Sequence, residues 1–381
     1  MNDLDVQHLR RAIRIAMKGR GSTEPNPSVG CVIVKGERVI GEGHTQAFGG
    51  AHAEPTALAN CSESPAGATV YVTLEPCCHT NKKTPPCAPR LIEAKIARVV
   101  VGCLDPNPDV DGKGIAMLRD AGVQVDRVAE ELQAETTQLI APFIAQTKFH
   151  RPYITLKWAQ TADGKIAGPG GTRMQISNAA ANRVVHQFRS RCDAILVGIN
   201  TVLADDPMLT ARDVETSRLQ ARIVLDSKLR TPVDSQLVKS AEEMPVDIYL
   251  TSAGFAADRV KPLLSKGVRL VVADADDDGR ISLPRLLARK DFSEITHLLV
   301  EPGPTLARSF FDAGAADRVW IIRSQQMVND LAAPGAVKLP ARYVQTAEIN
   351  LDGDVLTEYL DRESDVFFSA VASADAVMAS V

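Results

Sequence analysis

The chain has 381 residues, of which 45% are hydrophobic and 24% charged, a composition that excludes a disordered or fibrous protein. The formal net charge of −4 gives no excess of basic residues for gripping a nucleic-acid backbone, and no apolar run approaches the ~20 residues that span a bilayer. We therefore expect a cytoplasmic protein of two or three domains, with neither a nucleic acid nor a membrane as partner.

The first 145 residues are predicted to alternate helices with strands. Val6, Leu9, Ile13 and Met17 recur at spacings of three and four residues, which predicts an amphipathic helix at the start of the chain. Apolar, β-branched runs then predict buried strands. The predicted strands cover 30–34, 38–41, 69–74 and 98–103, and the predicted helices cover 55–60, 90–94, 115–121 and 129–145.

A boundary near residues 146–152 is predicted to separate a domain at 1–147 from a domain at 151–365. Beyond the boundary, apolar strands alternate with helical stretches, which favours a mainly parallel sheet covered by helices. The predicted strands lie at 154–158, 194–199, 222–226, 247–250, 268–272, 297–301 and 318–322, with helices such as 178–190, 282–290 and 305–313 between them.

The residues most informative about chemistry are His52, Glu54 and a group of cysteines between 77 and 87. A catalytic zinc takes three ligands from the protein and keeps one position for water, and one imidazole with two thiolates would supply those three. A carboxylate that does not bind the metal can carry protons, which is the role predicted for Glu54. The pattern H-x-E followed by P-C is typical of zinc nucleobase deaminases. Residues i and i+2 diverge in a regular helix, so His52 and Glu54 converge only at an irregular helix start.

A closed structural zinc site is the main alternative, because His79 could supply a fourth ligand and displace water. That site would leave Glu54 without a task, so we favour the catalytic one. The spacing leaves open whether Cys77 or Cys78 is the ligand. The remaining cysteines are interpreted as small packing residues: Cys31, Cys61, Cys103 and Cys192.

Four segments of this region carry a specific resemblance: Pro25–Val34, Gly49–Glu54, Thr73–Cys77 and Thr84–Cys87. They resemble the bifunctional deaminase/reductase family of riboflavin biosynthesis. The family usually has one residue fewer between its two cysteines. We interpret the loop at 79–83 as one residue longer, although Cys78 as ligand would restore the usual spacing.

The resemblance implies a cytidine-deaminase-like domain at the N-terminus. In it, His52, Cys77 and Cys87 would hold zinc, and Glu54 would carry the proton. Asn26 resembles the asparagine that such deaminases place in the base pocket, although it is also a common turn residue in the sequence Pro-Asn-Pro.

The segments 151–157, 163–167, 198–210 and 300–306 resemble the reductase domain of the same family. This resemblance implies a dihydrofolate-reductase-like α/β domain that uses NADPH. The residues that it assigns to NADPH are Ala159, Gln175, Thr201, Asp205, Ser227, Gly303, Pro304, Thr305, Leu306, Ala307, Arg308 and Ser309. Those that it assigns to the substrate and its phosphate are Arg173, Arg189, Leu209, Arg212 and Glu301. Lys157 and Asp163 are further candidates for orienting substrate, although Asp163-Gly164 is equally a plain turn.

Two stretches differ from the family pattern. Arg173 and Gln175 stand where the family usually has serine and an aromatic residue, and Ser324–Asp330 replaces a glycine-rich stretch that contains Pro-Lys. Loss of the aromatic residue removes a stacking surface beside the nicotinamide. A deaminase with an altered or inactive reductase domain is therefore one alternative.

The predicted function is a two-step enzyme of riboflavin biosynthesis. Zinc-dependent deamination of 2,5-diamino-6-ribosylamino-4(3H)-pyrimidinone 5′-phosphate would be followed by NADPH-dependent reduction of the ribosyl group to ribityl. A further alternative is a non-enzymatic, zinc-stabilised protein that binds a nucleotide. The charge balance disfavours a nucleic-acid-editing deaminase. We expect a small-molecule pyrimidine substrate and a homo-oligomer.

Overall fold

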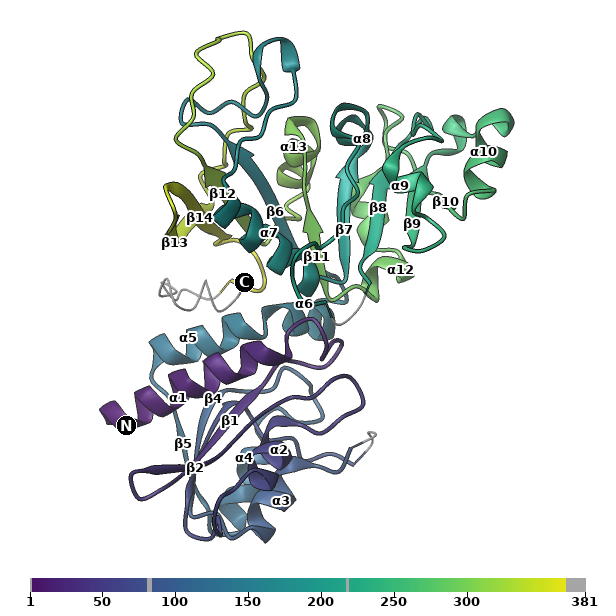
Figure 1. The fold of residues 1–381 in the computed structure, drawn as a ribbon. Coiled ribbons are helices and arrows are strands. Elements are labelled where there is room, and N and C mark those ends of the chain that lie inside the picture. Colours follow the sequence, from purple (N-terminus) through teal and green to yellow (C-terminus); the bar gives the residue numbers. More distant parts are fainter. Residues whose placement is uncertain (1, 81–83, 217–218, 368–381) are drawn as a thin grey trace. The chain divides into compact units, whose positions relative to one another are not determined.

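Two separate sheets organise the chain, and each lies in its own unit. The computed structural model describes residues 2–80, 84–216 and 219–367. Of these described residues, 2–150 form a first unit around a five-stranded sheet, and those from 151 to 367 form a second unit around a nine-stranded sheet (Figure 1). None of the described helices is long and apolar enough to cross a membrane. Both units mix helices with strands, which confirms the predicted α/β class.

The sheet of the first unit combines antiparallel with parallel pairing. Its order is β2-β1-β3-β4-β5, in which β1 runs antiparallel to β2 and β3, whereas β3, β4 and β5 run parallel. The strands are β1 (Gly30–Lys35), β2 (Arg38–His44), β3 (Thr69–Leu74), β4 (Arg98–Cys103) and β5 (Gln124–Arg127). The first four occur where apolar runs predict them. The sequence analysis missed β5, in which Val125 is the one buried apolar residue.

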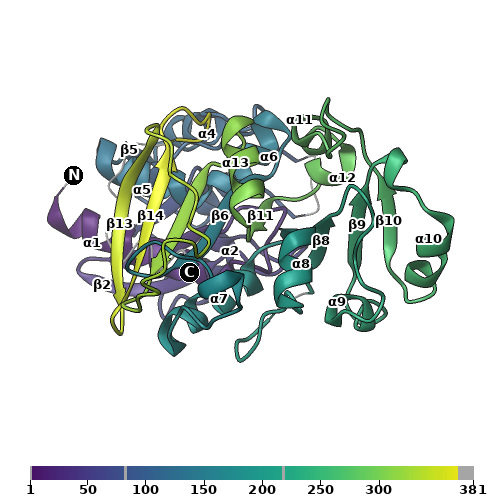
Figure 2. The ribbon, with the colours of Figure 1, turned by 90° about the horizontal axis from the view of Figure 1, so that it is seen from above.

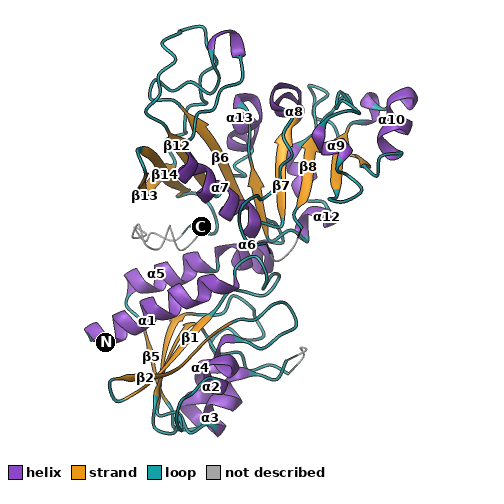
Figure 3. Ribbon diagram, in the orientation of Figure 1, coloured by secondary structure: helices purple, strands orange, loops and turns teal. Residues whose placement is uncertain are grey.

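Helices cover both faces of this sheet (Figure 3). One face packs against α1 (Asp3–Ala16) and α5 (Glu130–Leu139), and the other lies against α2 (Ala53–Ala59), α3 (Cys87–Glu93) and α4 (Lys113–Asp120). A short 3-10 turn, η1 (Met17–Gly19), follows α1.

The local sequence determines where α1 begins and where the last helical stretch of the first unit is divided. The side chain of Asn2 accepts a hydrogen bond from the backbone of Asp5 in a capping box, and Leu9 packs into the core. The single helix predicted over 129–145 is instead two helices, α5 and α6 (Ala141–Phe149). Pro142 lies in the first turn of α6, where it lacks the N–H that a continuous helix would need.

Parallel strands dominate the sheet of the second unit. Its order is β10-β9-β8-β7-β11-β6-β12-β14-β13, parallel from β10 to β12 and antiparallel through β14 and β13. The strands are β6 (Tyr153–Gln160), β7 (Ala194–Gly198), β8 (Ala221–Leu225), β9 (Val246–Leu250), β10 (Arg269–Val272), β11 (His297–Val300), β12 (Arg318–Arg323), β13 (Tyr343–Leu351) and β14 (Asp354–Asp361). The parallel strands lie where the sequence predicts them. The β13–β14 hairpin was missed, since polar residues interrupt its apolar pattern.

Helices lie on both faces of this sheet (Figure 2). Figure 2 shows α7 (Ala179–Arg191), α8 (Ile199–Asp205) and α9 (Gln236–Lys239) on one side, with α11 (Leu283–Leu287), α12 (Lys290–Ser293) and α13 (Pro304–Asp312) on the other. The remaining elements are η2 (Pro169–Gly171), η3 (Ser252–Gly254) and α10 (Ala257–Leu264). The helix predicted over 282–290 is two short helices, because Arg289 between them has an extended backbone.

The carboxyl ends of the central parallel strands lie together at one edge of this sheet. β6, β7 and β11 run parallel, β7 leads directly into α8, and β11 leads into the turn before α13. Beneath that edge, Leu156, Leu196 and Val300 are buried in one apolar core with Phe310. Parallel sheets commonly bind ligands at the carboxyl ends of their strands.

Candidate functional sites

Helix α2 begins directly after His52. His52 has an extended backbone (φ −71°, ψ 174°), and Ala53 and Glu54 open the first helical turn. This is the irregular helix start that lets residues at positions i and i+2 converge. Strand β2 packs very close to α2 at Gly43. A side-chain carbon at this position would lie only 2.3 Å from the backbone nitrogen of Ala57. Only glycine fits at that position of β2.

Cys77 and Cys87 come together through the backbone as well as through their side chains. Cys77 follows β3, and Cys87 is the first residue of α3. The carbonyl oxygen of Cys77 accepts hydrogen bonds from the N–H groups of Cys87 (3.0 Å) and Ala88 (3.1 Å). The N–H of Cys87 also lies 3.4 Å from the Cys77 sulfur. The first N–H groups of α3, which have no acceptor within the helix itself, therefore bind the loop that carries Cys77 and fix its position.

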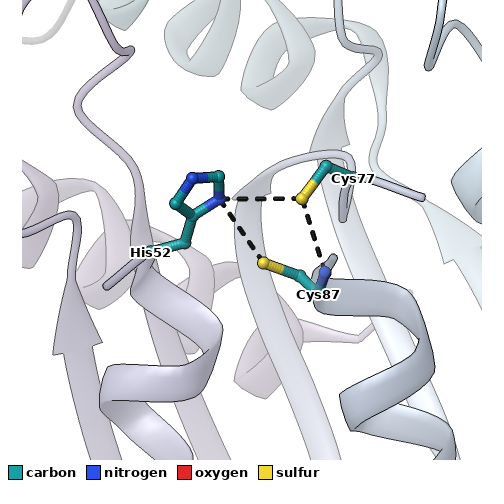
Figure 4. Close-up of side chains that lie close together, drawn as sticks. All are labelled: His52, Cys77 and Cys87. Atoms are coloured by element: carbon teal, nitrogen blue, oxygen red, sulfur yellow. Dashed lines mark hydrogen bonds between the residues drawn. The ribbon is translucent and has the colours of Figure 1, made fainter. Parts of the chain in front are cut away.

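The side chains of His52, Cys77 and Cys87 face one another (Figure 4). The Nδ1 atom of His52 lies 3.6 Å from the Cys77 sulfur and 3.5 Å from the Cys87 sulfur. Tetrahedral zinc with bonds of ~2.0 Å to nitrogen and ~2.3 Å to sulfur separates such ligands by about 3.5 Å. Within the described residues these three form the group that could hold a metal, with ligand atoms within 4.8 Å of one another. Donor chemistry and spacing both fit zinc with three protein ligands.

Thr84 contacts the opposite side of the His52 ring. Its hydroxyl oxygen lies 3.2 Å from Nε2. When Nε2–H donates to this oxygen, Nδ1 carries a lone pair toward the two sulfurs, and such second contacts orient metal-ligating histidines. No role was predicted for Thr84, although its place before Pro85-Pro86-Cys87 offered a signal.

Cys78 and His79, the two alternatives that the sequence left open, are placed differently. The Cys78 sulfur donates to the carbonyl oxygen of Asp109 at 3.9 Å. His79 lines the same cavity as Cys77 but does not belong to the group of residues that could hold a metal. The extra residue between the cysteines was predicted in the loop at 79–83, and residues 81–83 of that loop lie outside the described residues.

Glu54 is buried next to the cysteines. Its exposed fraction is 3%. Burial raises the pKa of Glu54 to about 7; Cys77 adds to the rise, whereas His52 opposes it. Removal from water penalises the charged carboxylate, so this side chain holds a proton more readily than an exposed glutamate. His52, Glu54 and Cys77 share a cavity of about 340 Å³ with Asn26 and Asn107.

Glu75 holds the loop behind this cavity, and the sequence analysis gave it no role. Its side chain is 2% exposed. One carboxylate oxygen accepts hydrogen bonds from the N–H groups of Gly114 (2.9 Å) and Ile115 (3.2 Å), and the other accepts from Gly112 (2.9 Å) and Asp105 (3.4 Å). Glu75 thus caps the start of α4 from another element, one residue before the Pro76-Cys77 pair.

The second unit has a cavity of about 650 Å³ at the carboxyl ends of its central strands. All five residues predicted to meet the substrate line it: Arg173, Arg189, Leu209, Arg212 and Glu301. The residues predicted for NADPH that line it are Ala159, Gln175, Thr201, Asp205, Gly303, Pro304 and Ala307. The others lie outside its lining, namely Ser227, Thr305, Leu306, Arg308 and Ser309.

The predicted NADPH residues outside the lining have other contacts. The Ser227 hydroxyl accepts a hydrogen bond from the N–H of Ile281 at 3.2 Å. Leu306 packs against the core, and the Ser309 hydroxyl donates to the Thr305 carbonyl within α13. Helix α13 carries Thr305, Leu306, Arg308 and Ser309 together with the lining residues Pro304 and Ala307, whereas Ser227 follows β8.

A tight ion pair lies inside this cavity. Arg189 on α7 donates to both carboxylate oxygens of Glu301, at 2.8 Å and 2.6 Å. Burial by itself would raise the pKa of Glu301, but Arg189 and then Lys157 outweigh it and lower the pKa to about 2. Burial lowers the pKa of Lys157. Arg189 and Glu301 thus form a charged pair in a cavity that Lys157, Arg173 and Arg212 also line.

The unusual residues of the second unit meet at the cavity wall. The side-chain nitrogen of Gln326 donates to the carbonyl oxygens of Gln175 (3.0 Å) and Ile176 (2.9 Å). Asp163 accepts from the N–H groups of Val328 (3.2 Å) and Asn329 (2.9 Å). Through these hydrogen bonds the Asp163 carboxylate holds the divergent stretch.

Comparison with known proteins identifies relatives of both units. The family model for the cytidine and deoxycytidylate deaminase zinc-binding region matches residues 2–103. The family model for the RibD C-terminal domain matches residues 152–328. Sequence and structure comparisons extend the likeness across both matched regions.

The curated relatives include riboflavin biosynthesis protein RibD of Actinobacillus pleuropneumoniae, 44% identical over 84% of this chain and 82% of its own. RibD of Aquifex aeolicus is 39% identical over 87% of this chain and 89% of its own. Among solved structures, a diaminohydroxyphosphoribosylaminopyrimidine deaminase/5-amino-6-(5-phosphoribosylamino)uracil reductase from Thermotoga maritima is 31% identical, with a TM-score of 0.79. That match covers 94% of this chain and 99% of the other.

Proposed function

Because this chain belongs to the RibD family of riboflavin biosynthesis proteins, we propose that it carries out two successive steps on a pyrimidine ribosyl phosphate. It is a bifunctional enzyme with a deaminase and a reductase activity. We assign the first step to residues 1–147 and the second to residues 151–365. The first releases ammonia from 2,5-diamino-6-ribosylamino-4(3H)-pyrimidinone 5′-phosphate, and the second reduces the ribosyl group to ribityl.

For the deaminase step, we propose His52, Cys77 and Cys87 as ligands of zinc. A zinc ion held there would supply a Lewis acid that makes water reactive at neutral pH. Thr84 keeps the Nδ1 side of the His52 ring turned toward the sulfurs. The fit of the three donor atoms to tetrahedral spacing supports this assignment.

Glu54 is the proposed proton carrier. It accepts a proton from the attacking water and delivers it to the amine that departs as ammonia, while the ring carbon gains a carbonyl oxygen. Its place in the same cavity as His52 and Cys77 supports this role. Asn26 lines that cavity too, and we propose that its amide hydrogen-bonds the pyrimidine ring.

For the reductase step, we propose that NADPH and the deaminated product share the larger cavity. NADPH would supply a hydride to the ribosyl carbon that bears the amino nitrogen, and the ribose ring oxygen would take up a proton as its bond to that carbon opens. Arg189 is already paired with Glu301, so its role is to orient that carboxylate next to the substrate. Arg212, whose side chain is exposed at the cavity, meets the substrate phosphate.

A deaminase with an altered reductase is the second candidate, and one observation favours it. Gln175 lines the cavity where the family usually has an aromatic residue, and its amide donates to the carbonyl oxygen of Ser177 at 3.0 Å. An amide offers less stacking surface than a ring. Ammonia release without NADPH oxidation would select this candidate.

The observation that carries the proposal is the convergence of one imidazole, two thiols and a buried carboxyl on one cavity. Its test supplies the zinc-loaded protein with the diaminopyrimidine phosphate and follows ammonia release and then NADPH oxidation. We expect one NADPH oxidised for each ammonia released. Failure to release ammonia would refute the proposed deaminase.

A further inference from the structure

The segment from Asp206 to Arg212 forms one wall of the cavity in the second unit without belonging to a helix or strand. Within it, Asp206 and Leu209 have φ values of 41° and 52°, a backbone conformation that residues other than glycine rarely adopt. Backbone of this kind persists where surrounding contacts hold it. Leu209 and Arg212 are also the residues of this wall that we assign to the substrate.

Side chains from outside hold both ends of this segment. At its start, the Gln236 side chain donates to the Asp206 carbonyl oxygen at 2.7 Å. At its end, Arg189 donates to the Thr210 carbonyl oxygen at 3.1 Å, and His186 accepts from the N–H of Arg212 at 3.2 Å. Because Arg189 also pairs with Glu301, the end of the segment is tied to the substrate region of the cavity.

Arg222 holds the middle of the segment. It lies on β8, is 1% exposed, and donates through Nη1 to the Met208 carbonyl oxygen at 3.0 Å. Nη1 also donates to the Ser240 hydroxyl (2.8 Å), and Nη2 donates to the Ser240 carbonyl (3.1 Å) and the Met244 carbonyl, whereas the buried Nε has no hydrogen-bond partner among the described residues. It forms no salt bridge with any carboxylate of the described residues. A buried guanidinium costs free energy unless its donors are satisfied, so these neutral oxygens must stay in place around it.

We propose that Arg222 is a positioning residue for the reductase step, fixing Met208 and through it Leu209 and Arg212 against the substrate. The inference rests on the proposed reductase function. Arg222 itself does not line the cavity, so it acts through the segment and touches neither substrate nor cofactor. Its planar fork reaches oxygens in several directions at once, whereas lysine offers one compact charge.

The test compares Arg222→Lys with a control at a second buried arginine. Arg318 is 4% exposed on β12 and stacks on Phe188 and Trp320, away from the cavity lining. For Arg222→Lys we expect the KM of the ribosylaminopyrimidine substrate to rise about tenfold with kcat within about twofold, the change expected when one charged hydrogen bond that aids binding is lost. NADPH affinity, measured by fluorescence titration, should stay at the wild-type value. Arg318→Lys should keep the wild-type KM even where it lowers the melting temperature.

A milder variant tests the inference if Arg222→Lys does not fold and therefore does not bind NADPH. Ser240→Ala removes one acceptor of Arg222 and leaves the Met208 contact, so we expect a KM rise of about two- to threefold. A wild-type KM in whichever of the two variants folds, or an equal KM rise in Arg318→Lys, would overturn the inference. A wild-type enzyme that oxidises no NADPH would instead refute the proposed reductase, and the inference with it.

Discussion

Single side chains decide the chemistry of the smaller cavity. His52 presents Nδ1 to two sulfurs because Thr84 contacts the other nitrogen of its ring. Glu54 is buried in the first turn of α2, two positions after His52, where a regular helix would turn it away. The extended backbone of His52 is therefore what allows His52 and Glu54 to line one cavity.

The proton-carrying role of Glu54 gives the first prediction. Glu54→Gln keeps the size of the side chain but cannot exchange a proton, so ammonia release should fall by about 10²–10⁴-fold. Zinc content should match the wild type, and NADPH oxidation with the deaminated substrate should be unchanged. Glu63→Gln, at the partly exposed partner of Arg38, is the matched control and should deaminate normally. A Glu54→Gln enzyme that deaminates at the wild-type rate would contradict the role.

Local sequence predicts side-chain chemistry here better than it predicts contacts. The types and order of His52, Glu54 and the cysteines suffice to suggest a zinc deaminase. Spacing alone could not choose between Cys77 and Cys78, since the choice depends on which way the loop after β3 turns. That turn is fixed by the N–H groups of α3, a contact between segments ten residues apart. Thr84 was missed for the same reason.

The elements around the smaller cavity depend on one buried carboxylate. Glu75 accepts hydrogen bonds from the backbone at the start of α4, and a glutamine there would turn a donor toward the same N–H groups. Hydrogen bonds to charged groups contribute roughly 1.5–3 kcal/mol each, so Glu75→Gln should lower the free energy of unfolding of the first unit by about 2–3 kcal/mol. Zinc affinity should fall as well, because Cys77 lies two residues away.

Chemical denaturation and chelator competition measure these two effects of Glu75→Gln. Glu93→Gln, at an exposed position of α3, is the control and should leave both values unchanged. Equal stability of Glu75→Gln and the wild type would contradict the capping role.

The ion pair between Arg189 on α7 and Glu301, the residue after β11, predicts that the second unit loses stability in acid. The pKa of Glu301 is about 2, because Arg189 and Lys157 outweigh the effect of burial. In the unfolded chain a glutamate titrates near pH ~4.3. The unfolded state therefore takes up the proton first as the pH falls. The contribution of the pair is complete above about pH 5 and is lost as the pH falls through about 4 toward 2.

Between about pH 6 and pH 2.5, we expect wild-type stability to fall by on the order of 2–3 kcal/mol more than that of Glu301→Gln. Tryptophan fluorescence follows this unit selectively, since the two tryptophans of the chain, Trp158 and Trp320, both lie in it. Glu348→Gln, at an exposed position of β13, should behave as the wild type. Parallel pH curves for the wild type and Glu301→Gln would contradict the prediction.

Secondary structure was predictable where one signal dominates and not where signals conflict. Most parallel strands of the second unit are short apolar runs with mainly buried residues, and all of them appear where expected. β5 and the β13–β14 hairpin were not predicted, because polar side chains interrupt their apolar pattern and pairing with neighbouring strands stabilises them. The split of the predicted helix over 129–145 followed from Pro142, a signal that the sequence offered.

The chain as a whole contains two units with separate cores and separate cavities. Each cavity is lined by residues of one unit, and the apolar clusters around Leu9 and around Phe310 share no residue. Removal of zinc by a chelator should therefore abolish ammonia release while NADPH oxidation with the deaminated substrate continues. Added zinc should restore deamination. A reductase rate that falls together with the deaminase rate would contradict this independence.

We propose three protein ligands for zinc, the imidazole of His52 and the sulfurs of Cys77 and Cys87. X-ray absorption spectroscopy at the zinc edge of the purified protein tests this proposal most directly. We predict two sulfur ligands at ~2.3 Å, one imidazole nitrogen at ~2.0 Å and one further light-atom ligand that is not imidazole. A second imidazole, a third sulfur, or a protein that binds no zinc would contradict the claim.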